Sequence, residues 1–83
     1  MNRQEIFEKL KEIAELTVQD PAVLANMNED SDLSTDLGLS SVGMLYIVIA
    51  IEEMFYIRMD DVSFGDFRTV RDVVDYIEKK IAE

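Results

Sequence analysis

Three serines near the middle of the chain are the side chains best placed to do chemistry: Ser34, Ser40 and Ser41. The sequence contains no histidine and no cysteine, so Ser-His catalysis, Cys-His catalysis and Cys/His zinc sites are excluded. The residues around the serines also do not follow the Gly-x-Ser-x-Gly pattern of serine hydrolases. A serine that only bears a phosphodiester needs no base of its own, because another enzyme makes the bond. We therefore expect a serine that is modified rather than one that catalyses.

Ser40 and Ser41 stand where a helix is expected to begin. They follow Asp36 and Gly38 and lead directly into the apolar segment Val42–Ile51. The N-terminus of a helix is a favourable place for a phosphate, since free backbone N–H groups and the helix dipole face it. This turn therefore predicts an attachment site for an anionic group.

The segment from Ser40 or Ser41 to about Tyr56 is predicted to be a helix with two apolar faces. The face that we assign to the core carries Leu45, Val48, Ile51 and Phe55. The neighbouring face begins beside Ser41 and carries Val42, Tyr46, Ile49 and Glu53. Because a surface helix needs only one apolar stripe, the second must be covered either by another helix or by a partner protein.

The remaining elements must position this helix. Asn2 and Glu5 predict a capping box that opens a first helix, which Asp20-Pro21 should stop. Its inward positions are Ile6, Leu10, Ile13, Ala14 and Thr17. From Asp20 to Ser40 no period is sustained, which predicts a long loop with a short turn of helix after Pro21. Its apolar anchors are Val23, Leu24, Met27, Leu33 and Leu37.

The C-terminal third predicts a brief third helix or turn within 58–67 and then a longer last helix. Thr69 and Asp72 form the capping-box pattern of that last helix. Its inner face carries Val70, Val73, Val74, Ile77 and Ile81. The expected fold class is all-α: a four-helix bundle with a long loop between helices 1 and 2 and a short third helix.

Bulk composition predicts one domain, residues 1–83, with 48% apolar residues and a net charge of −10. The excess of acid disfavours nucleic acid and anionic lipid as partners, favours basic partner surfaces, and leads us to expect a monomer. The N-terminus has no apolar core of signal-peptide type, and Val42–Ile51 is too short to span a bilayer. We expect no membrane insertion and a cytoplasmic location.

Three segments, in this order, resemble the acyl carrier protein family, whose hallmark is Asp-x-Gly-x-Asp-Ser-Leu entering the second helix of a four-helix bundle. The matching run here is Asp36-Leu37-Gly38-Leu39-Ser40-Ser41-Val42. The other two are Ile51-Glu52-Glu53-Met54-Phe55, like the family's Leu-Glu-Glu-x-Phe, and 69–77, like its final helix. The resemblance therefore covers nearly all of the chain.

The resemblance implies that Ser41, rather than Ser40, receives a 4′-phosphopantetheine arm from coenzyme A through a phosphopantetheinyl transferase. Asp36, Gly38 and Ser40 would form the supporting turn. The thiol of the arm would hold acyl groups as thioesters for acyl-loading and acyl-processing enzymes of fatty-acid, polyketide or specialised pathways. The chain itself would not be an enzyme.

The chain departs from the family pattern around the predicted docking surface. Ser40 replaces the usual aspartate, and Gly43 and Tyr46 stand where acids are usual. Glu52 and Glu53 remain, so we expect partner binding through Val42, Tyr46, Ile49, Glu52 and Glu53. This surface suits a partner with an apolar groove as well as basic groups, in a dedicated pathway.

Three alternatives stay open at this point, one of which is a structural or regulatory adaptor that uses the bundle without the arm. An aminoacyl or peptidyl carrier would show the same attachment turn. A calcium-binding helix-loop-helix is suggested by Asp30, Asp32, Ser34 and Asp36, but the positions that need glycine and glutamate hold Thr35 and Ser41. We expect no metal site.

Overall fold

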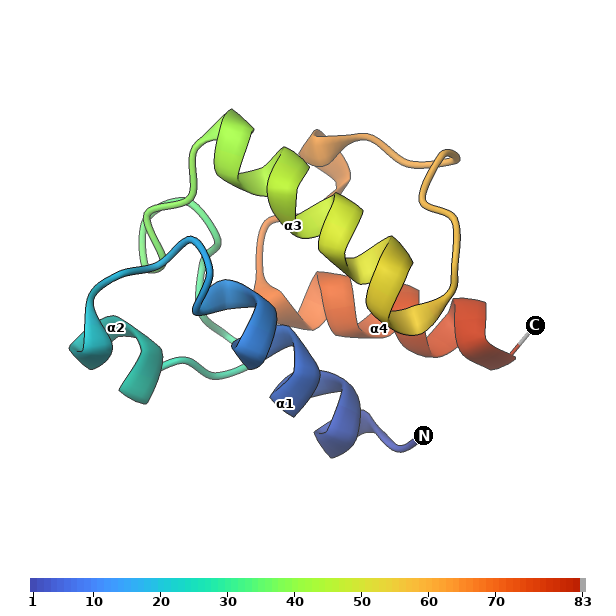
Figure 1. Ribbon diagram of the computed structural model, residues 1–83, viewed down its shortest axis with the longest axis horizontal. Coiled ribbons are helices and arrows are strands. Elements are labelled where there is room, and N and C mark those ends of the chain that lie inside the picture. The colour runs from blue at the N-terminus through green and yellow to red at the C-terminus, as the bar shows by residue number, and fades with distance from the viewer. Residues whose placement is uncertain (83) are drawn as a thin grey trace.

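Four α-helices and one 3₁₀ turn are present in the computed structural model, which describes residues 1–82 apart from the Phe64 side chain (Figure 1). In chain order they are α1 (Arg3–Ala14), α2 (Pro21–Ala25), α3 (Ser41–Phe55), η1 (Phe64–Asp66) and α4 (Val70–Ala82). No β-strand occurs within residues 1–82. The predicted all-α fold of four helices, one of them short, is confirmed. The short helix is α2, in the long connection, and the segment 58–67 holds only the 3₁₀ turn η1.

α1 begins where predicted and ends earlier than predicted. The Asn2 side chain accepts a hydrogen bond from the Glu5 backbone N–H at 2.8 Å, and the Glu5 carboxylate accepts one from the Asn2 N–H at 3.0 Å. The helix stops at Ala14, so Thr17 lies in the following turn and is not an inward helical position. Pro21 does not stop α1; it opens α2, with Asp20 as the N-cap. Proline suits a first helical position because it has no N–H to satisfy there.

The core-facing side of α3 differs from the predicted one. Leu45 is 49% exposed, and its assignment to the core is wrong, while Ile51 and Phe55 are buried as predicted. Met44 and Ile47 occupy the inward positions instead, and Val48 is half-buried. The spacing of apolar residues did not indicate which face of α3 is buried, because apolar residues surround most of this helix and its amphipathic pattern is weak.

The hydrophobic core lies where α1, α3 and α4 pack together. α1 contacts both α3 and α4, and the core is completed by residues of the connections. Its most fully buried large side chains are Ile6, Ile13, Ile51, Ile77, Val70 and Val74. The predicted loop anchors Met27, Leu33 and Leu37 are buried, and Val23 and Leu24 are partly buried against the core. Ile81 is 38% exposed, so its predicted place on the inner face of α4 is wrong.

Backbone hydrogen bonds fasten the long connection to the start of α4. The Leu33 N–H donates to the Arg68 carbonyl at 2.9 Å, and the Val70 N–H donates to the Ser31 carbonyl at 3.0 Å. Asp32 and Thr69 form an isolated antiparallel β-bridge between these bonds. The end of the connection that leads into α3 is thereby held beside α4, although the two segments are far apart in the sequence.

An ion-pair cluster also ties the long connection to α1 and α4. The Arg3 guanidinium at the start of α1 contacts the Glu29 and Asp75 carboxylates at 2.7 Å each and the Glu78 carboxylate at 3.2 Å. These contacts, the hydrogen bonds to Glu29 above all, raise the pKa of Arg3. Arg3 therefore joins α1, the long connection and α4.

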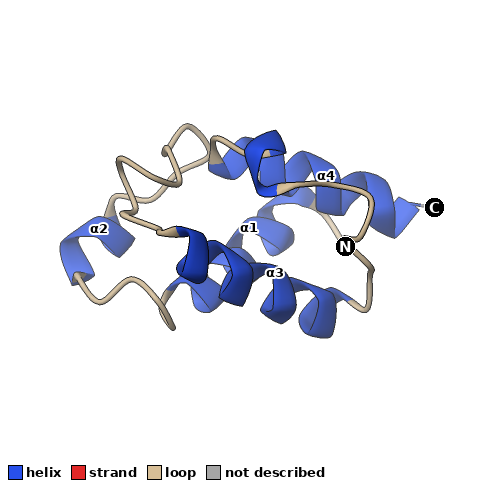
Figure 2. Ribbon diagram, turned by 90° about the horizontal axis from the view of Figure 1, so that it is seen from above, coloured by secondary structure: helices blue, strands red, loops and turns tan. Residues whose placement is uncertain are grey.

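Seen from above, α3 lies along one side of the molecule and α4 along the other, with α1 between them in the view (Figure 2). The first turn of α1 and the last turns of α4 lie in one half of the molecule, and α3 begins in the other half (Figures 1 and 2). None of the helices within residues 1–82 is both long and apolar enough to cross a membrane.

Candidate functional site

The turn that leads into α3 is held by backbone hydrogen bonds and by one glycine. The Asp36 carboxylate accepts a hydrogen bond from the Asp32 N–H at 2.7 Å, and the Leu39 N–H donates to the Leu33 carbonyl at 3.0 Å. Gly38 has φ +70°, a left-handed conformation that L-residues rarely adopt. A Cβ at Gly38 would meet no atom within 4 Å, so the backbone angle, and not space, requires the glycine.

Ser40 and Ser41 are neighbours with different environments. Ser40 is the N-cap of α3, and its hydroxyl oxygen accepts a hydrogen bond from the Gly43 N–H at 3.2 Å. Ser41 is the first residue of the helix and is exposed. Its hydroxyl makes no hydrogen bond to any residue of the described part of the chain. Ser40 is therefore engaged in the fold, and Ser41 is available at the surface.

A groove of about 240 Å³ opens beside Ser41 between the start of α3 and the segment before α4. Leu39, Met44 and Phe67 give it an apolar wall, and Asp32 and Arg68 bring charge to it. Sequence reasoning missed Phe67 and Arg68, because only the pairing of residues 31–33 with 68–70 brings them next to α3.

Leu39 and Met44 also line a small internal space of about 20 Å³ in the core. Leu33, Leu10 and Val73 are among its other walls, and nearly all of its lining is apolar. The groove at Ser41 and this internal space thus share three lining residues: Leu33, Leu39 and Met44.

Four of the five predicted docking residues are exposed: Val42, Tyr46, Ile49 and Glu53. Val42 is 77% exposed, Tyr46 50% and Ile49 49%. Tyr46, Ile49 and Glu53 form one side of an open groove of about 540 Å³, and α1 with its following turn forms the other side. Two groove residues on that side were not among the predicted docking residues: Glu12, and Leu16, which is 62% exposed. The sequence does not indicate which face of α1 lies beside α3.

Glu52 belongs to the fold more than to this groove. Its side chain is partly buried, and one carboxylate oxygen accepts a hydrogen bond from the Met59 N–H at 2.8 Å. Tyr56 is the C-cap of α3 and has φ +56°, so the chain turns sharply between Glu52 and Met59. Glu52 therefore ties the following loop back onto α3.

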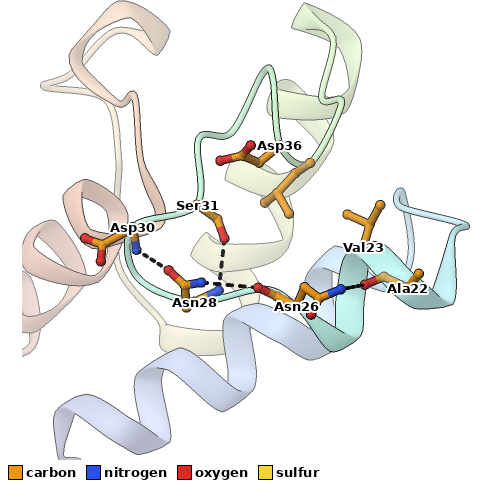
Figure 3. Close-up of a pocket in the computed structure, with 8 residues that line it drawn as sticks. Ala22, Val23, Asn26, Asn28, Asp30, Ser31 and Asp36 are labelled. Atoms are coloured by element: carbon orange, nitrogen blue, oxygen red, sulfur yellow. Dashed lines mark hydrogen bonds between the residues drawn. The ribbon is translucent and has the colours of Figure 1, made fainter.

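The acidic side chains of the long connection mainly bind backbone N–H groups. Figure 3 shows a polar pocket beside α2 in which Asn26, Asn28 and Ser31 are hydrogen-bonded to the local chain. The Asp32 carboxylate accepts hydrogen bonds from the Ser34 and Thr35 N–H groups at 2.8 and 2.9 Å, which lowers its pKa. Residues 1–82 contain no group of three or more His, Cys, Asp or Glu side chains placed to hold a metal ion.

Comparison with known proteins identifies the family. A family model described as "Phosphopantetheine attachment site" matches residues 4–77. The chain belongs to the acyl carrier protein family. It is 34% identical to an acyl carrier protein of Guillardia theta over 99% of both chains, and 37% identical to one of Thermotoga maritima over 96% of both. A third relative, the acyl carrier protein of Phytoplasma mali, is 35% identical over 92% of this chain and 88% of its own.

Family membership confirms the main functional prediction. The chain is a non-catalytic acyl carrier, with phosphopantetheine as its prosthetic group. Family members work with a phosphopantetheinyl transferase and with acyl-processing enzymes, so this carrier has partners of these two kinds.

Proposed function

We propose that Ser41 is the residue of this carrier that bears 4′-phosphopantetheine. The observation that carries the proposal is the contrast between the two serines. The Ser40 hydroxyl caps α3 through the Gly43 N–H, whereas the exposed Ser41 hydroxyl has no partner within residues 1–82. A transferase can therefore reach the Ser41 hydroxyl without breaking a hydrogen bond of the fold.

The surroundings of Ser41 fit the group. The first N–H groups of α3 and the positive end of its dipole favour the phosphate anion. The adjoining groove offers one cation, Arg68, and an apolar wall, which suit a group that joins a phosphate to a largely uncharged chain. When bound, the group supplies the thiol on which acyl thioesters form, and the chain's own residues orient it and keep it at the surface.

Intact mass after incubation with coenzyme A and a phosphopantetheinyl transferase tests the assignment. Ser41→Ala should show no mass increase, and Ser40→Ala, its matched neighbour, should still be modified. A modified Ser41→Ala together with an unmodified Ser40→Ala would move the attachment site to Ser40.

We infer that acyl-processing partners dock on the open groove between α1 and α3. Tyr46 and Ile49 supply apolar contacts on α3, and Leu16 extends the apolar floor across to the turn that follows α1. Glu12 and Glu53 stand on either side of it. A partner that combines an apolar ridge with flanking lysine or arginine side chains would match both features. Val42 extends this surface toward Ser41, whereas Glu52 contributes through the fold.

Docking is tested by the rate at which a transferase and an acyl-loading enzyme act on alanine variants. Tyr46→Ala and Leu16→Ala should raise KM, with Tyr46→Ala the stronger because aromatic anchors dominate interfaces. Leu45→Ala is the control, since Leu45 is equally exposed and lies outside the groove. Equal losses for Leu45→Ala and Tyr46→Ala would contradict this surface.

The partner enzymes determine which acyl group this carrier holds and in which pathway. Tyr46 and Gly43 replace the family's usual acids, which favours a dedicated carrier with specialised partners over general fatty-acid synthesis. An acyl cargo, rather than an aminoacyl or peptidyl one, agrees with the named relatives. A single domain, a cytoplasmic location and a monomeric state remain predictions, which cell fractionation and sedimentation equilibrium can check.

A further inference from the structure

The groove beside Ser41 has one cationic side chain in its lining, that of Arg68. Arg68 is exposed and stands just before α4, next to the half-buried Phe67. Ser41 opens α3, and the two residues share this groove because the Leu33 N–H bonds to the Arg68 carbonyl. The backbone position of Arg68 is therefore fixed relative to the turn that leads to Ser41.

The Arg68 guanidinium makes no direct polar contact within residues 1–82, although, after the backbone N–H groups that bind the Asp32 and Asp72 carboxyls, its charge acts on them at a distance and helps to lower the pKa of each. Unlike Arg3 and Arg71, whose side chains contact the Glu29 carboxylate, Arg68 forms no ion pair and no side-chain hydrogen bond with a described residue. The two nearby carboxylates have other partners. Asp32 accepts from the Ser34 and Thr35 N–H groups, and Asp72 accepts from the Arg68 and Thr69 N–H groups at 2.9 and 3.1 Å.

The chain has few basic residues near Ser41, so a cation in this groove would reduce the repulsion on a phosphate there. Between Glu12 and Phe67 the sequence has a single basic residue, Arg58, in a chain of net charge −10. Arg58 follows the far end of α3, after Tyr56. A phosphate on Ser41 would share the groove with the Asp32 carboxylate, and without a nearby cation these two anions would repel each other.

We propose that Arg68 is a positioning residue that binds the phosphodiester of the group carried by Ser41. Its planar guanidinium can donate two hydrogen bonds to the phosphate oxygens. The bound phosphate then directs the first part of the arm along the apolar wall of Leu39, Met44 and Phe67. This proposal rests on the assignment of Ser41 as the attachment residue.

Nuclear magnetic resonance of the free protein before and after modification provides the test. The Nε–Hε resonance of Arg68, assigned by its loss in Arg68→Gln, should shift when the group is attached, and about 1 M NaCl should move it back toward the unmodified position. The ³¹P resonance of the modified protein should be displaced in Arg68→Gln. Arg68→Lys should give an intermediate displacement, because lysine keeps the charge and loses the two-pronged geometry.

Arg58→Gln is the matched control, since it removes the same charge from the far end of α3 and should leave the ³¹P resonance unchanged. The proposal fails if the Arg68 resonance is the same before and after attachment, or if Arg68→Gln and the unaltered protein give the same ³¹P resonance. If the transferase does not accept Arg68→Gln, the Arg68 resonance of the unaltered protein decides. Absence of the mass increase on Ser41 would instead refute the attachment site itself.

Discussion

Tyr56 is held in a conformation that suits glycine better than tyrosine. It ends α3 with φ +56° and ψ +45°, and its side chain is 92% exposed, so no packing compensates for the strain. Left-handed backbone costs an L-residue roughly 1–2 kcal/mol. Tyr56→Gly should therefore stabilise the protein by up to about 1 kcal/mol after the added freedom of the unfolded chain is subtracted, as measured by urea unfolding. Tyr56→Ala keeps the Cβ and should show no such gain; an equal gain would assign the effect to the ring.

Asp72 stabilises the N-terminus of α4 to an extent that depends on pH. Its carboxylate accepts from the Arg68 and Thr69 N–H groups, which lowers its pKa from the ordinary 3.8. A carboxyl group with a lowered folded pKa stabilises the protein above its unfolded pKa, and this contribution is lost as the pH falls through the folded value. Asp72→Asn should thus cost about 1 kcal/mol at neutral pH.

Urea unfolding over a range of pH checks this prediction. The difference between Asp72→Asn and the unaltered protein should shrink as the pH falls below 3.8, where the carboxyl of the unfolded chain begins to bind a proton, and should be lost once the pH has fallen through the lowered folded pKa. A difference that stays constant down to the acid transition would mean that the shape of the side chain, and not its charge, supports α4.

α3 makes the clearest prediction at the level of an element, because its buried and exposed faces now differ from those expected. Truncating Met44 or Phe55 to alanine should cost roughly 2–5 kcal/mol by leaving a core cavity. Truncating Leu45, Tyr46 or Ile49 should cost under about 1 kcal/mol, as at surface positions. Thermal melts of the five variants measure both groups. If Tyr46→Ala and Ile49→Ala melt as early as Phe55→Ala, their face is buried in solution and the docking proposal loses its basis.

Local chemistry made several elements predictable from the sequence. The Asn2–Glu5 and Thr69–Asp72 pairs form their expected reciprocal hydrogen bonds, and Gly38 sits at the turn before Ser41. Each of these features depends on side chains and backbone a few residues apart.

Which side of each helix is buried was less predictable, because it depends on tertiary packing. On α3, apolar residues on almost every side left the choice between Met44 and Leu45 to neighbours that the periodicity cannot reveal. In the turn after α1, the same limit hid Leu16 from the predicted docking surface. Arg68 joins the Ser41 groove only through backbone pairing across the fold, which no local pattern announces.

Over the whole molecule, eighteen acidic residues face eight basic ones. Attraction at Arg3, Arg71 and Lys80 opposes the general repulsion, since each of these side chains contacts at least one carboxylate. The net charge of −10 makes repulsion the larger effect. Adding NaCl or millimolar MgCl₂ should therefore raise the melting temperature, and calorimetry measures the change. A fall with NaCl would show that the ion pairs outweigh the repulsion, and no change would show that the two balance.

The separation between the chain ends and the start of α3 has a practical consequence for handling the protein. The Arg3 guanidinium lies 3.2 Å from the Glu78 carboxylate, so the first turn of α1 and the last turns of α4 are neighbours, and α3 starts in the other half of the molecule. A fluorescent tag, a fused enzyme or a solid support joined before α1 or after α4 would be tethered away from Ser41. Carriers arrayed on a chip by either end would thus present their serines outward, ready for loading.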